Sequence, residues 1–345
     1  MPIDMHAHWV PQALAEALRA RAEPPYFRPA DDGRDTLHFP GMALPQRVTD
    51  LDAVIAGMNR HNFDAQLLSL GGLMLASLQV LRGTEAAPLC RLVNDAAADA
   101  CRAHPGRFYA LAVLPNEDIA LATAEFERAM ALPGFIGAIL PGGGFLDRRR
   151  ADRWRPLFAA AQARGGAHFL IHDSLVFEDF QRPRGDKPDN EPVRRGTLAM
   201  QANLSSIMVT LNMTDYLDDF PDVGVQVHNL GGNVPFEISR MDHLALFQKR
   251  EGGLPSRRFT RTIVDCNSFS APAIELAVAL YGADRIVLGT DGSEFGMDWS
   301  LRAIDEARID KSQKRAILDG NAGGILKRFA GVEGSPAREA NAEAG

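Results

Sequence analysis

Cysteine is scarce in this 345-residue sequence, and its scarcity limits how the chain can be held together. The three cysteines, Cys90, Cys101 and Cys266, are odd in number, and no two have Cys-x-x-Cys spacing. A disulfide-dense secreted domain is therefore excluded. We interpret all three as reduced, mostly buried thiols of a cytoplasmic protein, with a catalytic thiol at Cys266 as the functional alternative.

Excess positive charge and long apolar runs are also missing. Lys and Arg number 37 against 44 Asp and Glu, and the net charge of −7 leaves no broad basic surface for nucleic acid or an anionic membrane. No apolar run approaches the roughly 18 residues that a membrane span requires. No signal peptide is expected, because no charged segment followed by an apolar one begins the chain. We therefore expect a small-molecule partner, with neither nucleic acid nor membrane.

Eight short apolar runs recur along the chain, separated by segments that carry helix-forming residues at helical spacing. The runs are residues 2–8, 63–71, 108–115, 135–143, 167–173, 224–231, 262–268 and 285–292. Strands that alternate with helices form a parallel sheet, and eight such units close into a barrel. The predicted fold is therefore α/β, a distorted (β/α)8 TIM barrel.

Two segments fall outside this repeat. Residues 20–46 are rich in turn residues, with a hairpin expected around Asp32-Gly33. We interpret them as a small insertion after the first strand that lies over the barrel mouth. Residues 331–345 are small and polar and are expected to be disordered. The predicted organisation is a single barrel domain over residues 1–330.

The polar residues of the eight runs gather at their carboxyl-terminal ends, which meet at the mouth of a barrel. His6 and His8 share one face of the first strand, because successive side chains alternate. With His172 and Asp291 they supply three nitrogens and a carboxylate oxygen, a set that suits a catalytic divalent metal. His228, from the end of the sixth strand, is expected beside the metal as a ligand or as a general acid–base.

Three further polar residues of these runs have other expected roles. His168 lies four residues before His172 on the same face, about 13 Å away at roughly 3.3 Å per residue, so a structural role is expected. Asp4 lies one step deeper than the histidines, where it either orients one of them or makes a plain buried hydrogen bond. Asp265 ends the seventh strand at the mouth and is a candidate to touch substrate.

Four segments occur in an order that is characteristic of one family. They are DMHAH, FPDVGVQVHNLGG, ADRIVLGTDG and ILDGNAGGILKRF. In this order they resemble the amidohydrolase superfamily, in particular the branch that contains aminocarboxymuconate semialdehyde decarboxylase. The resemblance covers nearly the whole barrel. No lysine ends the fourth strand, FIGAILPGG, so the two-metal centre of other superfamily members is not expected.

The resemblance implies a role for each matching residue. His6, His8, His172 and Asp291 would bind one divalent metal ion, zinc in the first place, with manganese or iron as alternatives. His228 would act as the catalytic acid–base, and Asp291 would also take part in catalysis.

Two arginines match the same family. Arg47 in QRVTDLD and Arg240 in SRMD correspond to arginines that hold substrate carboxylate in the resembling decarboxylase, the second from a neighbouring subunit. A guanidinium fork is suited to bidentate carboxylate recognition. A salt bridge at the surface or between helices is the alternative for each. The resemblance therefore implies a homodimer that acts on a small carboxylic acid.

Three reactions share this set of residues. The first is non-oxidative decarboxylation of an unsaturated or aromatic carboxylic acid, with substrate oxygens on the metal, carboxylate held by arginine, and His228 or Asp291 delivering a proton to carbon. The alternatives are hydrolysis of a C–C, ester or amide bond by a metal-activated water and hydration of a double bond. A barrel that only binds a ligand is disfavoured, because so many polar residues gather at the mouth. The sequence thus indicates a metal-dependent lyase or hydrolase.

Overall fold

The main sheet contains eight parallel strands in the order β1-β5-β6-β7-β8-β9-β10-β11. The computed structural model describes residues 1–30, 34–40, 42–46, 48–174, 176, 194–249, 251–292 and 296–331. The strands are β1 (Ile3–His8), β5 (Ala65–Ser69), β6 (Phe108–Ala112), β7 (Phe135–Pro141), β8 (His168–His172), β9 (Gly224–Val227), β10 (Ile263–Asp265) and β11 (Ile286–Val287). Each lies within one of the eight predicted runs, which confirms the strand pattern.

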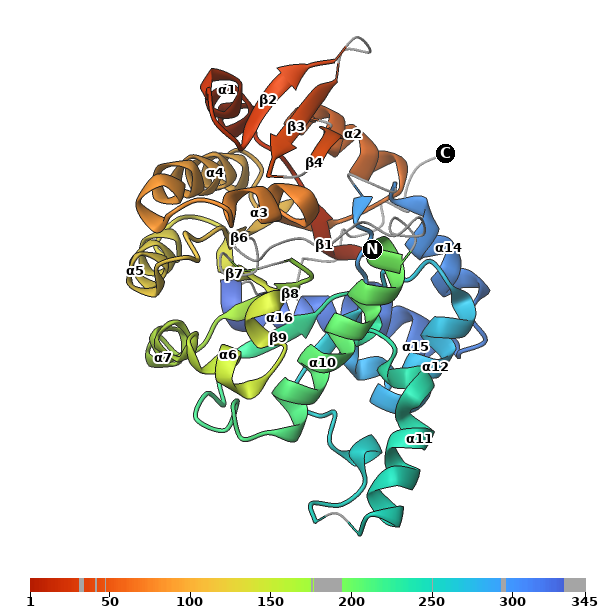
Figure 1. Cartoon of the computed structure of the whole chain (residues 1–345). Helices are drawn as coiled ribbons and strands as arrows, with labels where there is room; N and C mark the ends of the chain where they lie inside the picture. The colour runs from red at the N-terminus through yellow and green to blue at the C-terminus, as the bar shows by residue number, and fades with distance from the viewer. Residues whose placement is uncertain are drawn as a thin grey trace, which may run out of the picture.

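The two outer strands of this order are joined by backbone hydrogen bonds. The N–H of Met5 donates to the carbonyl of Leu288 at 2.8 Å. The N–H groups of Thr290 and Asp291 both donate to the carbonyl of His6, at 3.1 and 2.9 Å. The sheet is thereby nearly closed, and helices surround it (Figure 1). The predicted (β/α)8 barrel is confirmed, and its closure brings His6 and Asp291 side by side.

Helices cover the outside of the barrel (Figure 1). They are α1 (Gln12–Ala20), α2 (Leu51–Arg60), α3 (Gly72–Leu78), α4 (Gly83–Ala103), α5 (Ile119–Ala129), α6 (Arg148–Asp152), α7 (Arg155–Ala163), α10 (Met200–Met213), α11 (Val234–Phe247), α12 (Ala271–Tyr281), α14 (Asp298–Glu306), α15 (Lys311–Arg315) and α16 (Asn321–Ala330). Asp118 begins α5 by accepting two backbone N–H groups, as an N-cap residue does. Aromatic side chains fill the space between helices and strands. Phe158 of α7 and Phe126 of α5 both pack on Phe169 of β8, with ring centroids 4.8 and 5.6 Å apart.

The interior of the barrel is partly polar. Most strand residues are buried and apolar, as in FYALA of β6. On alternating positions of β1 and β9, however, the buried side chains are Asp4, His6, Gln226 and, just past the strand end, His228. A buried polar group costs free energy unless it is hydrogen-bonded. The partners of these side chains therefore decide what this column of polar residues does.

The insertion after β1 forms its own antiparallel sheet. Its strands are β2 (Tyr26–Pro29), β3 (Asp35–Phe39) and β4 (Met42–Gln46). Strands β2 and β3 form the arms of the expected hairpin, whose turn at Asp32-Gly33 lies outside the described residues. The fully buried side chains of Phe27 and Leu37 belong to the hydrophobic core that also includes Met5 of β1. In Figure 1 the sheet stands between α1 and α2.

The helices, the chain end and the cysteines bear on three further predictions. Among the helices of the described ranges, none has the length and apolar composition needed to cross a membrane. The tail expected to be disordered, 331–345, lies outside the described residues except for Gly331. All three cysteines are free and buried, as expected.

Candidate metal centre

Three histidine side chains converge where the barrel strands end. His6 and His8 come from β1, and His172 is the last residue of β8. The Nε2 atom of His8 lies 3.2 Å from that of His6 and 3.1 Å from that of His172. The ligand nitrogens of the three lie within 4.8 Å of one another, and Oδ1 of Asp291 is 3.1 Å from His8 Nε2. The structure thus brings together the four residues that the sequence analysis selected as ligands.

The far nitrogens of His6 and His8 are held by hydrogen-bond acceptors. His6 Nδ1 is 3.0 Å from Oδ2 of Asp265, and an ionised carboxylate only accepts. His8 Nδ1 is 3.1 Å from Oγ of Ser69, whose own hydrogen is donated to the carbonyl of Ala7 at 2.9 Å. In both rings Nδ1 therefore carries the hydrogen, and the lone pair of Nε2 faces the centre.

The third histidine follows the same pattern. His172 Nδ1 donates to the carbonyl of Asp173 at 3.2 Å, so its Nε2 is also a lone pair. With all three rings neutral, none of these facing nitrogens can donate to another. Oδ1 of Asp291 is buried and has no hydrogen-bond partner among the described residues. Lone pairs that face one another at these distances repel each other. A divalent cation between them would bind all four groups, so the residues present fit a metal ion.

Burial and charge determine the protonation of these groups. Burial favours neutral His6, but the carboxylate of Asp265 outweighs it and raises the pKa of His6 to about 9. Burial and the neighbouring histidines together lower the pKa of His172 well below its ordinary value. Burial opposes ionisation of Asp291, yet the facing histidines, His8 first, hold its pKa well below the usual range. Asp291 is thus ionised and His172 neutral, as metal ligands must be, whereas His6 holds a second proton near neutral pH that a bound metal ion would displace.

A glycine leaves room for the ring of His8. Gly71 precedes α3 and lies so close to that ring that a Cβ at this position would overlap it. Only a residue without a side chain fits here. The pattern of residues in the sequence carried no sign of this requirement.

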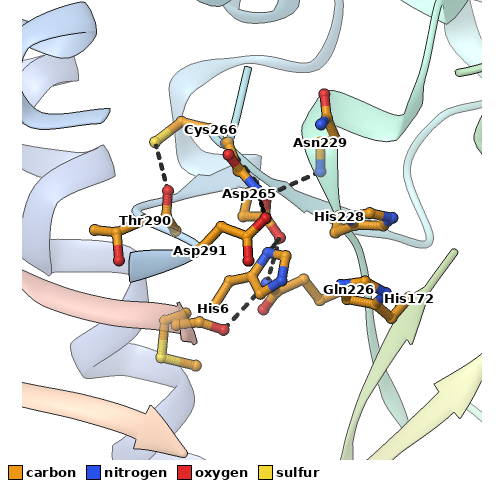
Figure 2. Close-up of polar contacts among 12 residues, drawn as sticks. His6, His172, Gln226, His228, Asn229, Asp265, Cys266, Thr290 and Asp291 are labelled. Carbon is orange, nitrogen blue, oxygen red and sulfur yellow. Dashed lines mark hydrogen bonds and ion pairs between the residues drawn. The ribbon is translucent and has the colours of Figure 1, made fainter. Parts of the chain in front are cut away.

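His228 lies beside the three histidines rather than among them. Its ring stacks on that of His172, with centroids 4.2 Å apart and planes 15° apart (Figure 2). Its Nε2 accepts the backbone N–H of Asp173 at 2.9 Å, so the hydrogen of the neutral ring is on Nδ1. Burial, and then the charge of His6, lower the pKa of His228 to about 3. Its Nδ1 is buried without a hydrogen-bond partner in the described part of the chain.

Asp265 supports the centre rather than facing the mouth. Its Oδ2 accepts from His6, and its Oδ1 accepts the backbone N–H of Asn229 at 2.9 Å (Figure 2). Asn267, two residues later, donates its side-chain amide to Oδ2 of Asp291 at 3.0 Å. Both oxygens of Asp265 are thus occupied by protein donors, which leaves little for the substrate contact considered from the sequence.

Asp4 binds backbone groups rather than an imidazole. Its Oδ1 accepts the N–H groups of His6 and Thr290, at 3.2 and 3.0 Å. Its Oδ2 accepts the hydroxyl of Thr290 at 2.6 Å and the side-chain amide of Gln66 at 3.0 Å. Asp4 thereby joins β1 to the segment that carries Asp291. Of the two expected roles, the buried hydrogen bond is the one observed.

Cys266 does not offer a nucleophile. Its Sγ is buried and lies 3.9 Å from the carbonyl of Gly289. Burial raises the pKa of this thiol to about 12, and a thiol that stays protonated is a poor nucleophile. The catalytic alternative for this residue is not supported.

A cavity of about 320 Å³ opens beside His8, between β4 and the start of α3. Its apolar walls are formed by Trp9, Leu70, Leu73 and Met74, and Arg34 also lines it. The indole N–H of Trp9 donates to the carbonyl of Thr49 at 3.0 Å, which holds the ring in place. The volume is typical of small-ligand sites. The cavity suits a small, partly apolar molecule with an acidic group.

The described residues place neither of the two arginines implied by the resemblance at this centre. Arg47 lies outside the described residues. Arg240 is exposed on α11, which lies at the periphery of the molecule (Figure 1). It makes no hydrogen bond or ion pair with any residue that the structure describes.

Comparison with known proteins gives one family and several relatives. A family model described as amidohydrolase matches residues 3–328. Gamma-resorcylate decarboxylase of Rhizobium sp. (strain MTP-10005) is 24% identical over 302 residues, which cover 80% of this chain and 90% of that protein. The Metarhizium anisopliae IDCase in apo form has a TM-score of 0.75 at 20% identity, covering 95% of this chain and 97% of that one. The dihydroxybenzoic acid decarboxylase of Polaromonas sp. JS666, with bound manganese and the inhibitor 2-nitroresorcinol, has a TM-score of 0.65 at 21% identity, covering 94% and 96%.

Proposed function

The chain belongs to the amidohydrolase family of enzymes, and from that premise we propose that it is a metal-dependent, non-oxidative decarboxylase of an aromatic carboxylic acid. The observation that carries the proposal is the convergence of three Nε2 lone pairs and Asp291 beside a cavity of ligand size. The likeness to gamma-resorcylate decarboxylase supports the substrate class. A hydrolase of C–C, ester or amide bonds, or a hydratase, is the alternative that uses the same residues.

We propose one divalent metal ion per chain, held by His6, His8, His172 and Asp291. When bound, such an ion supplies a Lewis acid for substrate oxygens. Zinc is the first expectation, and the manganese of the Polaromonas structure supports manganese equally, with iron as the third candidate.

A proton must replace the carboxyl group that leaves. The ring carbon is first protonated, the bond to the carboxyl carbon then breaks, and its electron pair restores the conjugated ring as CO2 departs. We assign this proton transfer to Asp291, because its Oδ1 faces the centre with no hydrogen-bond partner among the described residues. The proton comes from a hydroxyl group of the substrate, whose ionisation enriches the ring in electrons.

His228 is proposed to help as a neutral hydrogen-bond donor. Its Nε2 accepts the N–H of Asp173, so loss of the Nδ1 hydrogen would leave an imidazolate, and protonation of Nε2 would set two N–H groups against each other. A neutral imidazole with a fixed N–H can stabilise negative charge on substrate oxygens. The resemblance implied that His228 acts as an acid–base. We propose instead that it only donates a hydrogen bond and that Asp291 transfers the proton.

We propose that Arg34 and Arg47 bind the substrate carboxylate. Arg34 lines the cavity beside His8, and Arg47 follows Gln46, another lining residue. A guanidinium in an apolar-walled site is well suited to a carboxylate.

We also propose a homodimer in which α11 is covered by a second copy of the chain and Arg240 completes the partner's site. Phe236 and Phe247 of this helix are each 77% exposed, which is unusual for side chains of this size. With Arg240 they follow a spacing of four and seven residues, which puts all three on one helix face. A two-fold interface would bury that face and create two shared sites.

The buried free thiols support a cytoplasmic location, which we propose as well. Reducing compartments keep cysteines in this state.

The reaction is tested by incubating metal-loaded protein with hydroxybenzoic and muconate-type acids, and with esters and amides of the same acids. We expect CO2 release and the matching decarboxylated product. Hydrolytic products without CO2 would replace the proposal by its alternative. The Asp291→Asn variant, which keeps the shape of the side chain, controls for uncatalysed decarboxylation.

The dimer is tested by mixing two inactive variants, Arg240→Ala and His6→Ala. In a mixed dimer one site carries both defects and the other carries neither, so activity returns in part after subunit exchange. Confirmed exchange without any return of activity would show that Arg240 does not act across the interface.

A further inference from the structure

A series of hydrogen bonds runs through the barrel interior to the metal centre. It begins at the end of the barrel where the strands start, opposite the mouth, which we call the lower end. His168, the first residue of β8, has its Nε2 3.0 Å from Oε1 of Gln226 on the neighbouring strand β9. Nε2 of Gln226 donates to Oδ2 of Asp265 at 2.9 Å. The same oxygen accepts Nδ1 of His6 at 3.0 Å (Figure 2). All four side chains are at most 1% exposed.

Each group of this series leaves the next a single orientation. Nε2 of Gln226 faces two acceptors, Oδ2 of Asp265 and the carbonyl of Met5 at 3.3 Å. The amide cannot turn over without placing its oxygen against both. Its oxygen therefore faces His168, and because an amide oxygen only accepts, Nε2 of His168 carries the hydrogen.

Gln226 in turn determines how Asp265 holds His6. The other oxygen of Asp265 accepts the backbone N–H groups of Asn229 and Asn267, at 2.9 and 3.3 Å. Surrounded by four donors, the carboxylate stays ionised and in place. It keeps the hydrogen of His6 on Nδ1 and the Nε2 lone pair turned to the centre. Without the amide of Gln226, Oδ2 of Asp265 would lose one of its two donors. The ring of His6 would then be held less firmly.

We propose that His168 and Gln226 are positioning residues of the metal centre: His168 orients the Gln226 amide, and the amide holds Asp265 against His6. The inference rests on the proposed metal site and is independent of the reaction that takes place there. A buried pair of purely structural value would stabilise the fold without changing metal affinity. This series of hydrogen bonds ends on Nδ1 of a ligand histidine, and mutation of residues behind metal ligands typically changes metal affinity by about 10- to 100-fold.

The lower end of the barrel offers a route to His168 that does not pass through the substrate cavity. A second cavity, of about 530 Å³, is bordered by His168, Gly224 and Phe329, with Arg328 also in its lining. A small solute can therefore reach the position of His168 from below. This allows a missing imidazole to be replaced from solution.

Two isomeric side chains test the hydrogen bond itself. In His168→Gln the amide nitrogen stands where Nε2 stood, whereas in His168→Asn it stands at the position of Nδ1, out of reach of Gln226. The readout is the Kd for Mn²⁺ of the metal-stripped protein, measured by competition with a fluorescent chelator. We expect the Gln variant to bind like wild type, and the Asn variant and Gln226→Leu to bind about 10-fold more weakly. Arg328→Ala, at the rim of the same cavity, should be unchanged.

Chemical rescue gives a second, independent readout. In His168→Gly, imidazole at millimolar concentration should restore Mn²⁺ affinity, because its N–H can donate to Gln226. The 1-methyl derivative has no N–H and should not restore it. Wild type with the same additions corrects for direct binding of imidazole to the metal.

The outcomes separate the inference from the proposed function. If wild type binds Mn²⁺ and the folded Asn and Leu variants bind it equally well, the inference is wrong and the metal site remains. If wild type binds no divalent metal, the proposed function fails and the inference with it. Should Gln226→Leu not fold, the Gln and Asn variants of His168 and the rescue decide.

Discussion

The two ends of the barrel use buried polar residues in opposite ways. Along the axis and at the lower end, both oxygens of Asp4, the side-chain amide of Gln226 and Nε2 of His168 are paired with protein partners. At the mouth, Nδ1 of His228 and Oδ1 of Asp291 are buried without a hydrogen-bond partner among the described residues. A buried polar atom left unpaired costs about 1–3 kcal/mol, and beside the three facing histidines such atoms indicate where a ligand completes the site. Buried polar atoms that have protein partners instead indicate residues that hold other side chains in place.

Strand β8 contains both cases. His168 and His172 lie on the same face of this strand, four residues apart. Nε2 of His168 meets an amide oxygen that accepts its hydrogen, whereas Nε2 of His172 meets the lone pair of His8 at 3.1 Å. The same residue type is therefore a support at one end and a candidate ligand at the other. The following predictions test this distinction.

The largest effect is expected when a ligand at the mouth is removed. His172→Ala should lose the metal and with it all measurable activity, because only His6, His8 and Asp291 remain. Elemental analysis of the purified protein checks this. His104→Ala, a half-buried histidine at the end of α4, should keep full occupancy. Full metal content in His172→Ala would contradict the assignment of the mouth as the metal centre.

A methyl group beside the mouth should be nearly as harmful. In Gly71→Ala the new Cβ overlaps the ring of His8, which must move. A displacement of about 1 Å at a catalytic site can cost about 10²-fold, so we expect at least that loss in kcat/KM and a weaker metal affinity. Gly323→Ala in α16 has no neighbour within 4 Å and should leave both unchanged. Equal behaviour of the two variants would show that the space beside His8 is not critical.

The N–H of His228, which has no hydrogen-bond partner among the described residues, should matter for catalysis and not for metal binding. His228→Ala should lower kcat by about 10²-fold while metal content stays at the wild-type level. In His228→Asn an amide nitrogen can stand at the position of Nδ1, so part of the activity should return. Loss of metal in the Ala variant would instead make His228 a ligand.

Arg34 tests substrate binding at the same end. Arg34→Ala should raise KM for a substituted benzoate about 10-fold, the loss of one charge-assisted hydrogen bond, with kcat and metal content unchanged. Arg28→Ala in the same inserted sheet is the control, because Arg28 bonds to backbone carbonyls and does not line the cavity. An unchanged KM for Arg34→Ala would exclude it as the carboxylate partner.

The smallest effect concerns the paired histidine at the lower end. Burial lowers the pKa of His168 from 6.5 to about 4. Between these two pH values, His168 is protonated in the unfolded chain and neutral in the folded chain. Its contribution to stability is present above pH 6.5 and is lost as the pH falls toward 4. Wild type should therefore lose about 2 kcal/mol more than His168→Gln between pH 7.5 and pH 5. Urea unfolding at both pH values measures the difference, and equal losses would mean that His168 is not held neutral.

Much of the fold could be predicted because it depends on local pattern. Eight apolar runs between helical segments were sufficient for the strand pattern, and the polar residues at the ends of these runs pointed to the mouth. The prediction was least accurate at the last two strands. β10 and β11 are only three and two residues long, and beyond β11 the chain contacts β1 through the N–H groups of Thr290 and Asp291, which donate to the carbonyl of His6.

The supporting residues could not be predicted, because their partners are distant in sequence. Asp265 is 259 residues from His6, whose ring it holds, and Ser69 is 61 residues from His8. Position 71 requires glycine only because the ring of His8 packs against it. No local pattern contains such pairs.

The sequence by itself determined the alternation of strands and helices and the alternation of side chains along each strand. These follow from hydrophobic periodicity and from backbone geometry, and they place His6 and His8 on one face wherever the strand lies. Only the tertiary structure decided which nitrogen of each histidine carries the hydrogen. That depends on the acceptor that barrel closure brings to Nδ1, such as Asp265 for His6. The lone pairs that can bind a metal are therefore a property of the closed barrel, because a hydrogen bond forms only between groups that the fold has brought together.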